Sequence, residues 1–217
     1  MADHRLLYYI TDRSQFHGDE RSRRRDLLAK VAEAARAGVD YIQLREKDLS
    51  ARELETLARE VVAVVRKNSS STRLLINHRT DVALAAEADG VHLRSDDVAA
   101  SEVRHVLEVA HRPSQAAHFL VAASCHTAAD VLRAESGQAD FAVFAPVFGK
   151  RGVAGTPPAG LAALHEACQA KIPVVALGGV TMENAASCLD AGAAGVAGFS
   201  LFQENKIEEL VRKLRAL

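Results

Sequence analysis

Short apolar runs rich in β-branched residues alternate along this chain with segments in which apolar residues recur every three or four positions. The short runs are typical of buried strands, and the spaced segments are typical of amphipathic helices. We expect eight strands, at Leu6–Thr11, Tyr41–Glu46, Arg73–Asn77, Gly90–Leu93, Phe119–Ser124, Phe141–Phe148, Ile172–Leu177 and Gly195–Ser200. We expect helices at Arg24–Ala37, from a Ser50 cap to Lys67, at Asp81–Ala88, Ala99–Ala110 and Thr127–Ala134, from a Thr181 cap to Ala191, and at Glu204–Leu217.

This order of elements indicates the fold class. Strands that alternate with helices imply a parallel sheet, and eight such units imply closure into a single α/β domain, a (β/α)8 TIM barrel over residues 1–217. An open doubly wound sheet is the competitor, and it usually carries a glycine fingerprint after its first strand. The stretch from Tyr8 to Arg13 has no glycine, and no linker divides the chain, so one barrel is favoured.

Composition narrows the classes of partner and compartment. The chain has 217 residues, 48% of them hydrophobic, which is slightly short for this barrel but ample for its core. Its formal net charge of -1 argues against nucleic acid, and the basic cluster from Arg21 to Arg25 is interpreted as a solvated helix start. Three cysteines without metal spacing indicate a reduced, cytoplasmic protein, and we expect neither a signal peptide nor a membrane span.

Polar residues collect where the predicted strands end, which is where barrels of this class place their active sites. In the second strand, Gln43, Arg45 and Lys47 alternate onto one face, while the outward positions are expected to be apolar. Such side chains inside a barrel are costly unless a ligand meets them, so the strand predicts an anionic substrate. The other candidates are Asn77, His78, Arg79, His92, Asp96, Asp97, Ser124, His126, Lys150, Arg151, Gly178, Gly179, Gly198 and Ser200.

Two groups among these candidates suggest particular ligands. Glycines 178, 179 and 198, with Ser200, follow strands seven and eight, where backbone N–H groups commonly bind phosphate; tight packing is the alternative. Asp96 and Asp97 could bind Mg²⁺, or could cap the following helix.

The remaining candidates bear on proton transfer and closure of the site. His126 follows strand five and could act as an acid or base, or be purely structural. Lys150 and Arg151 lie in a long cationic loop that could close over a phosphorylated ligand, or be a surface loop. A lysine aldolase or decarboxylase on the same barrel is a further alternative, for which Lys47 would form the substrate adduct.

Taken together, these stretches resemble the thiamine phosphate synthase family over nearly the whole chain, from Tyr8 to Phe202. The matching stretches are Tyr9 to Arg13, Gln43 to Lys47, Ile76 to Arg79, Ala88 to Leu93, Ser124 to Thr127, Ala145 to Phe148 and Val174 to Val180. The resemblance implies a transferase that joins hydroxymethylpyrimidine diphosphate to thiazole phosphate with Mg²⁺ as cofactor. A homodimer is expected only by analogy with this family.

The resemblance also implies residue roles. Gln43, Arg45, Lys47 and Asn77 would hold the pyrimidine diphosphate, Asp97 would bind Mg²⁺, and Ser124 would contact the diphosphate. Gly179 and Ser200 would hold the thiazole phosphate.

Three features depart from the family pattern. His78 stands where the family usually has aspartate, Arg94-Ser95 replaces Gly-Gln, and the loop after Phe148 lacks Thr-x-Thr-Lys. One aspartate of the 96–97 pair could then hold the metal with the diphosphate, and Lys150 or Arg151 could supply the missing cation. These departures keep open a metal-independent thiazole tautomerase that uses His126, and a non-catalytic barrel that binds a thiamine precursor.

Overall fold

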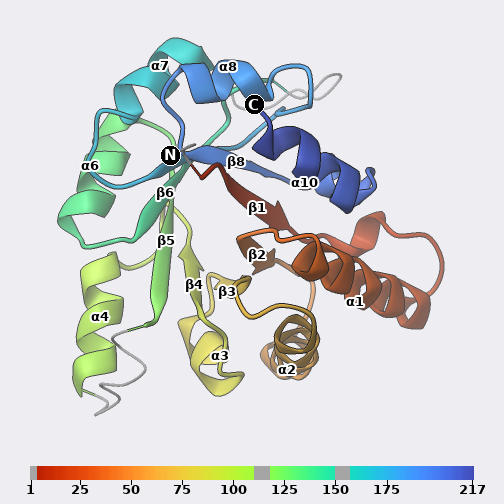
Figure 1. The fold of residues 1–217 in the computed structure, drawn as a ribbon. Coiled ribbons are helices and arrows are strands. Elements are labelled where there is room, and N and C mark those ends of the chain that lie inside the picture. Colours follow the sequence, from red (N-terminus) through yellow and green to blue (C-terminus); the bar gives the residue numbers. More distant parts are fainter. Residues whose placement is uncertain (1–3, 110–117, 150–156) are drawn as a thin grey trace.

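The computed structural model describes residues 4–109, 118–149 and 157–217, which form a closed parallel barrel (Figure 1). The strands are β1 (Leu6–Ile10), β2 (Tyr41–Leu44), β3 (Arg73–Asn77), β4 (Gly90–Leu93), β5 (Leu120–Cys125), β6 (Phe141–Phe144), β7 (Val174–Ala176) and β8 (Gly195–Gly198). They pair in sequence order, and β8 returns to pair with β1. The predicted (β/α)8 barrel is therefore confirmed.

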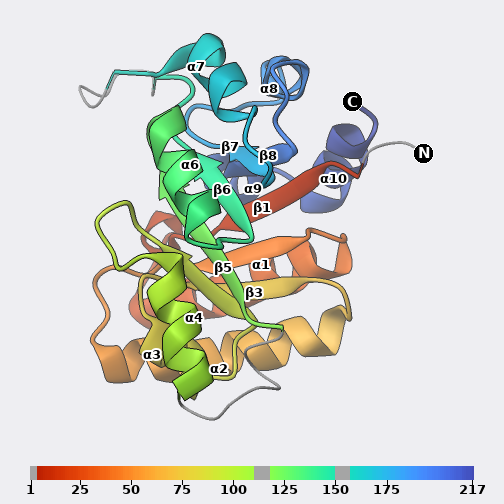
Figure 2. The same ribbon diagram turned by 90° about the vertical axis from the view of Figure 1, so that its left-hand side faces the viewer.

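Helices cover the outside of the barrel (Figures 1 and 2). They are η1 (Arg13–Gln15), α1 (Glu20–Arg36), α2 (Ala51–Asn68), α3 (Thr80–Ala85), α4 (Ala100–Val109), α6 (Ala128–Ser136), α7 (Gly160–Ala167), α8 (Ala185–Asp190), α9 (Ser200–Gln203) and α10 (Ile207–Arg215). Among the described helices none is both long and apolar enough to cross a membrane. The cap predicted at Ser50 is confirmed, and Ser50 forms a capping box with Glu53.

Several predicted boundaries were wrong. Helix α1 begins at Glu20, because Asp19 accepts the N–H of Ser22 and caps it; the arginine cluster therefore lies within the helix. Strand β6 ends four residues early, since Pro146 has no N–H to donate to the ladder. Helix α7 was not predicted from the sequence. The predicted cap at Thr181 was also wrong, because the N-cap position of α8 is Asn184.

The interior of the barrel is layered from apolar to polar along its axis. Near the ends where the strands begin, the rings of Tyr41 and Phe141 stack with centroids 4.7 Å apart, and Tyr8 contacts both edge-on. Closer to the ends of the strands, the inward positions become polar, as at Gln43 in β2 and His92 in β4, the two strands that pair with β3. Thus the floor is a packed aromatic core, and the other end holds the groups that can meet a ligand.

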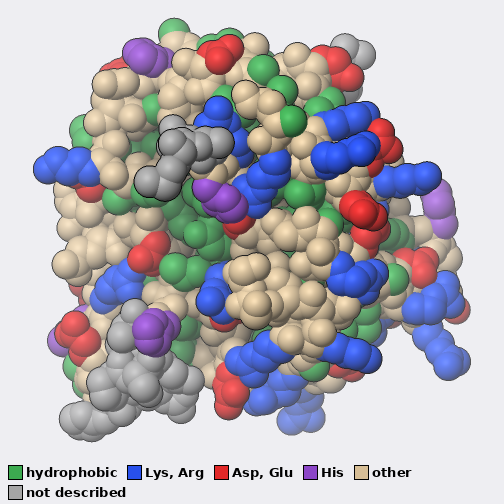
Figure 3. All heavy atoms as spheres, viewed as in Figure 1, with side chains coloured by type: hydrophobic (Ala, Val, Ile, Leu, Met, Phe, Trp, Pro, Cys, Tyr) green, Lys and Arg blue, Asp and Glu red, His purple; other side chains and the backbone are tan. Residues whose placement is uncertain are grey.

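Figure 3 shows the face at which the strands begin, on the side opposite the polar end. Acidic and basic side chains intermix over it, as expected for a chain of net charge -1. The polar mouth of the barrel lies on the left in Figure 2, where the strands end.

Candidate active site

Two cations follow β2 at the mouth of the barrel. The guanidinium of Arg45 lies 5.1 Å from the centroid of the Phe199 ring, and its backbone N–H donates to Thr11 Oγ1 at 3.0 Å. Lys47 is exposed, and the charge of Arg45 is the largest cause that lowers the pKa of Lys47, followed by partial burial and Arg94. Within the described part of the chain, neither Arg45 nor Lys47 forms an ion pair with a carboxylate, so both remain free to meet an anion.

Gln43 lies just below these cations on the same inner face. Only 2% of the residue is exposed, and its Nε2 atom has no hydrogen-bond partner among the described residues. A buried amide without a partner costs about 1–3 kcal/mol. An acceptor on a bound ligand would remove that cost, as the sequence pattern predicted.

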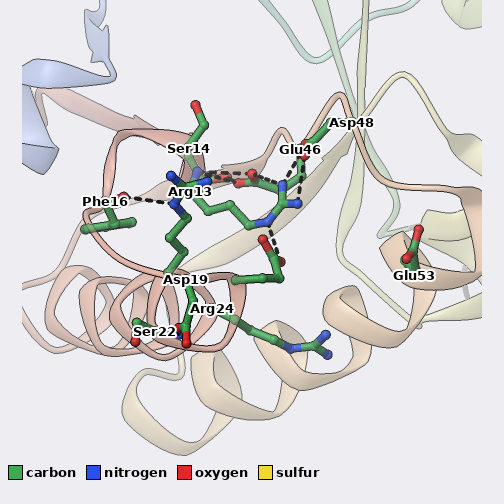
Figure 4. A network of polar contacts seen from close by, with 12 residues as sticks. Arg13, Ser14, Phe16, Asp19, Ser22, Arg24, Glu46, Asp48 and Glu53 are labelled. Carbon is green, nitrogen blue, oxygen red and sulfur yellow. Dashed lines mark hydrogen bonds and ion pairs between the residues drawn. The ribbon is translucent and has the colours of Figure 1, made fainter.

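Glu46 alternates to the outer face of the same segment and is bound by Arg13 (Figure 4). Its carboxylate accepts hydrogen bonds from Thr11 Oγ1 at 2.7 Å, the Arg13 N–H at 3.0 Å and Arg13 Nη1 at 3.1 Å. The guanidinium also donates to Asp48, at 2.7 and 2.9 Å, and to Glu20 at 2.8 Å. Burial raises the pKa of Glu46, and the hydrogen bond with Asp48 is the main cause that raises the pKa of Arg13.

The Arg13–Glu46 pair corrects the expectation that the outward positions of this segment are apolar. Because Arg13 neutralises Glu46, that carboxylate does not pair with Arg45 or Lys47 on either side of it. Sequence reasoning assigned no role to Arg13. The available signal was a glutamate on the apolar face of a buried segment, which requires a partner.

A chain of hydrogen bonds crosses the interior below the mouth. The hydroxyl of Tyr8 lies 3.0 Å from His92 Nδ1, and His92 Nε2 lies 2.8 Å from Ser124 Oγ. Burial, with a smaller contribution from Arg45, lowers the pKa of His92 to about 3, so the imidazole is neutral. The side chain of His92 thus points into the barrel and reaches Ser124.

Asp97 and Asp96 lie in the loop after β4, and the structure separates them. The carboxylate of Asp97 is nearly buried; Oδ1 lies 2.5 Å from His78 Nδ1, and Oδ2 accepts the Arg94 N–H at 2.7 Å. The exposed carboxylate of Asp96 pairs with the Arg94 guanidinium. Helix α4 begins only at Ala100, so the interpretation of these residues as its cap was wrong. Asn77 ends β3, paired with His92 of β4.

The glycines after β7 are required by close packing. A Cβ on Gly178 would lie 2.7 Å from Pro146 Cα, and one on Gly179 would lie 2.8 Å from Phe148 Cβ; both have positive φ. Gly198 ends β8, and exposed Ser200 starts α9, two residues after the strand that was predicted to include it. Since β7 and β8 are paired, both sets of residues lie at the same side of the mouth. Phosphate binding there stays a prediction.

His126 is exposed just beyond β5, and its Nδ1 lies 2.6 Å from the carbonyl oxygen of Ala145. A carbonyl can only accept, so Nδ1 donates a hydrogen to it. Its acid–base role stays a prediction. Lys150 and Arg151 lie outside the described residues.

Among the described residues no group of three or more histidine, cysteine or acidic side chains could hold a metal ion by itself.

Comparison with known proteins gives a consistent result. A family model described as "Thiamine monophosphate synthase" matches residues 7–202. A "Putative thiamine-phosphate synthase 2" from Aquifex aeolicus is 40% identical over 199 residues, covering 91% of this chain and 97% of that protein. A "Thiamine-phosphate synthase" from Syntrophomonas wolfei is 36% identical, covering 97% and 95%. The structure of a "Thiamine phosphate pyrophosphorylase" from Pyrococcus furiosus superposes with a TM-score of 0.77 at 28% identity, covering 97% and 94%.

Proposed function

The chain belongs to the thiamine monophosphate synthase family of transferases, and we propose that it joins hydroxymethylpyrimidine diphosphate to thiazole phosphate. The single observation that carries this proposal is the set of unpartnered polar side chains at the end of β2. There Arg45 and Lys47 have no carboxylate partner among the described residues, and the buried Nε2 of Gln43 lacks an acceptor. An anionic group next to a heterocycle with ring nitrogens would satisfy all three side chains.

In the proposed reaction, the bond between the pyrimidine methylene carbon and the ester oxygen of the diphosphate breaks, and its electron pair leaves with the diphosphate. The thiazole nitrogen then donates its lone pair to that carbon, which yields thiamine phosphate and diphosphate. Arg45 and Lys47 would stabilise the charge that develops on the leaving group, and Ser124 would donate a hydrogen bond to it. Gly179 and Ser200 would hold the thiazole phosphate close to the carbon that it attacks.

We propose Asp97 as the protein ligand of Mg²⁺. Its nearly buried carboxylate lies beside His78 at the mouth, and Mg²⁺ commonly binds one or two carboxylates together with substrate phosphate oxygens. When bound, the ion supplies additional positive charge to the diphosphate. Asp96 would contribute only after its pair with Arg94 opens. Lys150 and Arg151 are retained as proposed diphosphate contacts, and His126 as a proposed acid or base.

An assay with both phosphorylated substrates tests the proposal. Thiamine phosphate and diphosphate should appear in equal amounts when Mg²⁺ is present. Isomerisation of the thiazole phosphate without metal would instead assign a tautomerase, and binding without turnover would assign a non-catalytic barrel. A substrate adduct trapped by borohydride on Lys47 would assign the lysine chemistry.

A further inference from the structure

We propose that Tyr8 and His92 are positioning residues that fix the Ser124 hydroxyl as a hydrogen-bond donor toward an anionic oxygen at the mouth. This inference deepens the proposed function and rests on it for the identity of the anion, the substrate diphosphate. The tautomer of His92, however, follows from its buried contacts and its neutral state, and it can be measured without substrate.

The direction of the first hydrogen bond follows from the surroundings of Tyr8. The residue is fully buried, and its hydroxyl has one hydrogen-bond partner among the described residues, His92 Nδ1. Leaving a buried hydroxyl donor unpaired costs about 1–3 kcal/mol. Tyr8 therefore donates its hydrogen to Nδ1, and Nδ1 must carry a lone pair.

The second hydrogen bond follows from the first. His92 is neutral, since burial and the nearby charge of Arg45 lower its pKa to about 3. A neutral imidazole carries one hydrogen, so with Nδ1 as acceptor the hydrogen is on Nε2. Nε2 then donates to Ser124 Oγ across 2.8 Å. The hydroxyl oxygen of Ser124 is occupied as an acceptor, and no described residue accepts its hydrogen, which can therefore be donated to a ligand oxygen.

This arrangement determines what Ser124 can do. A serine activated as a nucleophile needs an imidazole lone pair to accept its proton, as in Ser–His catalytic pairs. Here the facing nitrogen carries a hydrogen, so Ser124 cannot be activated in this way. It is instead a fixed donor, partly exposed at the end of the barrel where Arg45 and Lys47 lie. Three donors at the same end of the barrel suit a diphosphate.

The tautomer can be tested on the unaltered protein. Long-range ¹⁵N–¹H correlation spectra of the neutral histidines should show His92 protonated at Nε2 and not at Nδ1. Assignment uses the His92→Gln variant, whose spectrum lacks these signals. A hydrogen on Nδ1 would overturn the inference, whatever the enzyme activity proves to be.

The coupling to Ser124 can be tested with inorganic diphosphate as the probe. Ser124→Ala should weaken its binding about tenfold, the value of one hydrogen bond to a charged group. His92→Leu should weaken binding by a similar factor in the otherwise unaltered protein but by less than about twofold in the Ser124→Ala background, because it acts through that hydroxyl. His92→Gln, which retains an N–H donor, should recover most of the loss.

Folding and function are separated by two further measurements. Tyr8→Phe/His92→Leu removes both buried polar partners together, so it provides a folded variant if His92→Leu alone is unstable. Equal losses from the His92 substitution in both serine backgrounds would refute the positioning role. Failure of the unaltered protein to turn over both substrates, with the Nε2 hydrogen observed, would refute only the proposed function.

Discussion

Removal of one member of the buried pair of Arg13 and Glu46 should destabilise the β2 end of the barrel far more than removal of an exposed partner. Side-chain exposure is 5% for Arg13 and 1% for Glu46, whereas the other two partners of Arg13, Asp48 and Glu20, are 67% and 59% exposed. Removing one member of a buried pair leaves an uncompensated charge and costs about 3–5 kcal/mol. An exposed pair is worth about 0–1 kcal/mol.

The expected result is therefore a large difference between two substitutions on the same network. Arg13→Met should lower the free energy of unfolding by about 3–5 kcal/mol, and the control Asp48→Asn by less than about 1 kcal/mol. Arg13→Met/Glu46→Gln should recover at least half of the first loss, because the buried charge is gone. Urea denaturation at neutral pH measures all three values.

The same variants carry a functional prediction. Without Arg13, the Glu46 carboxylate is left beside Arg45 and Lys47 in sequence and would neutralise part of their charge. Binding of inorganic diphosphate should weaken in Arg13→Met and return in the double variant. If Arg13→Met costs no more stability than Asp48→Asn, or if the double variant binds diphosphate no better, the assignment of Arg13 as the counter-ion of Glu46 is wrong.

Three further predictions concern the mouth and the interior. Arg45→Lys should raise KM for the pyrimidine diphosphate about tenfold, since lysine cannot reproduce the planar contact with Phe199. The control Arg59→Lys, at an exposed position, should leave KM unchanged. Equal KM values in the two variants would argue against Arg45 as a substrate contact. The pKa of His92 falls from 6.5 to about 3 on folding, so stability is full above pH 6.5 and is lost as the pH falls toward 3. Between pH 4 and 6, the free energy of unfolding should therefore rise with pH more steeply than in His92→Gln, by about 1.4 kcal/mol per pH unit. Parallel slopes in the two proteins would contradict this prediction. Asp97→Ala should weaken Mg²⁺ binding measured by calorimetry in the presence of diphosphate, and an unchanged affinity would exclude Asp97 as the ligand.

The barrel could be predicted from sequence because its signals are local. Each strand is a short apolar run that a helix follows, and the apolar residues Ile42 and Leu44 on either side of Gln43 correctly placed it on the inner face. Boundaries were less well predicted where a single residue decides them. Asp19 begins α1 and Pro146 ends β6, and neither signal is visible in hydrophobic periodicity.

The parts of the site that were missed depend on contacts between distant positions. Strand β4 has only four residues, too few for their alternation to show which face is inward. The inward face is determined by the pairing of β4 with β3, in which Asn77 lies opposite His92. In this register the imidazole contacts Tyr8 and Ser124. No spacing in the sequence indicates that residues 8, 92 and 124 meet.

The charges of the β2 segment explain how one short stretch can combine the proposed binding function with a structural one. The side chains of Arg45 and Lys47 lie on the inner face of the segment. Glu46 lies between them in sequence, but its side chain points to the outer face. Left to themselves, these neighbours would neutralise one another, and the mouth would lose its affinity for anions. A second arginine, 33 positions earlier, binds the carboxylate on the outer face, so the inner cations keep their charge. The proposed anion binding at the mouth should therefore depend on Arg13, a residue that need not contact the ligand.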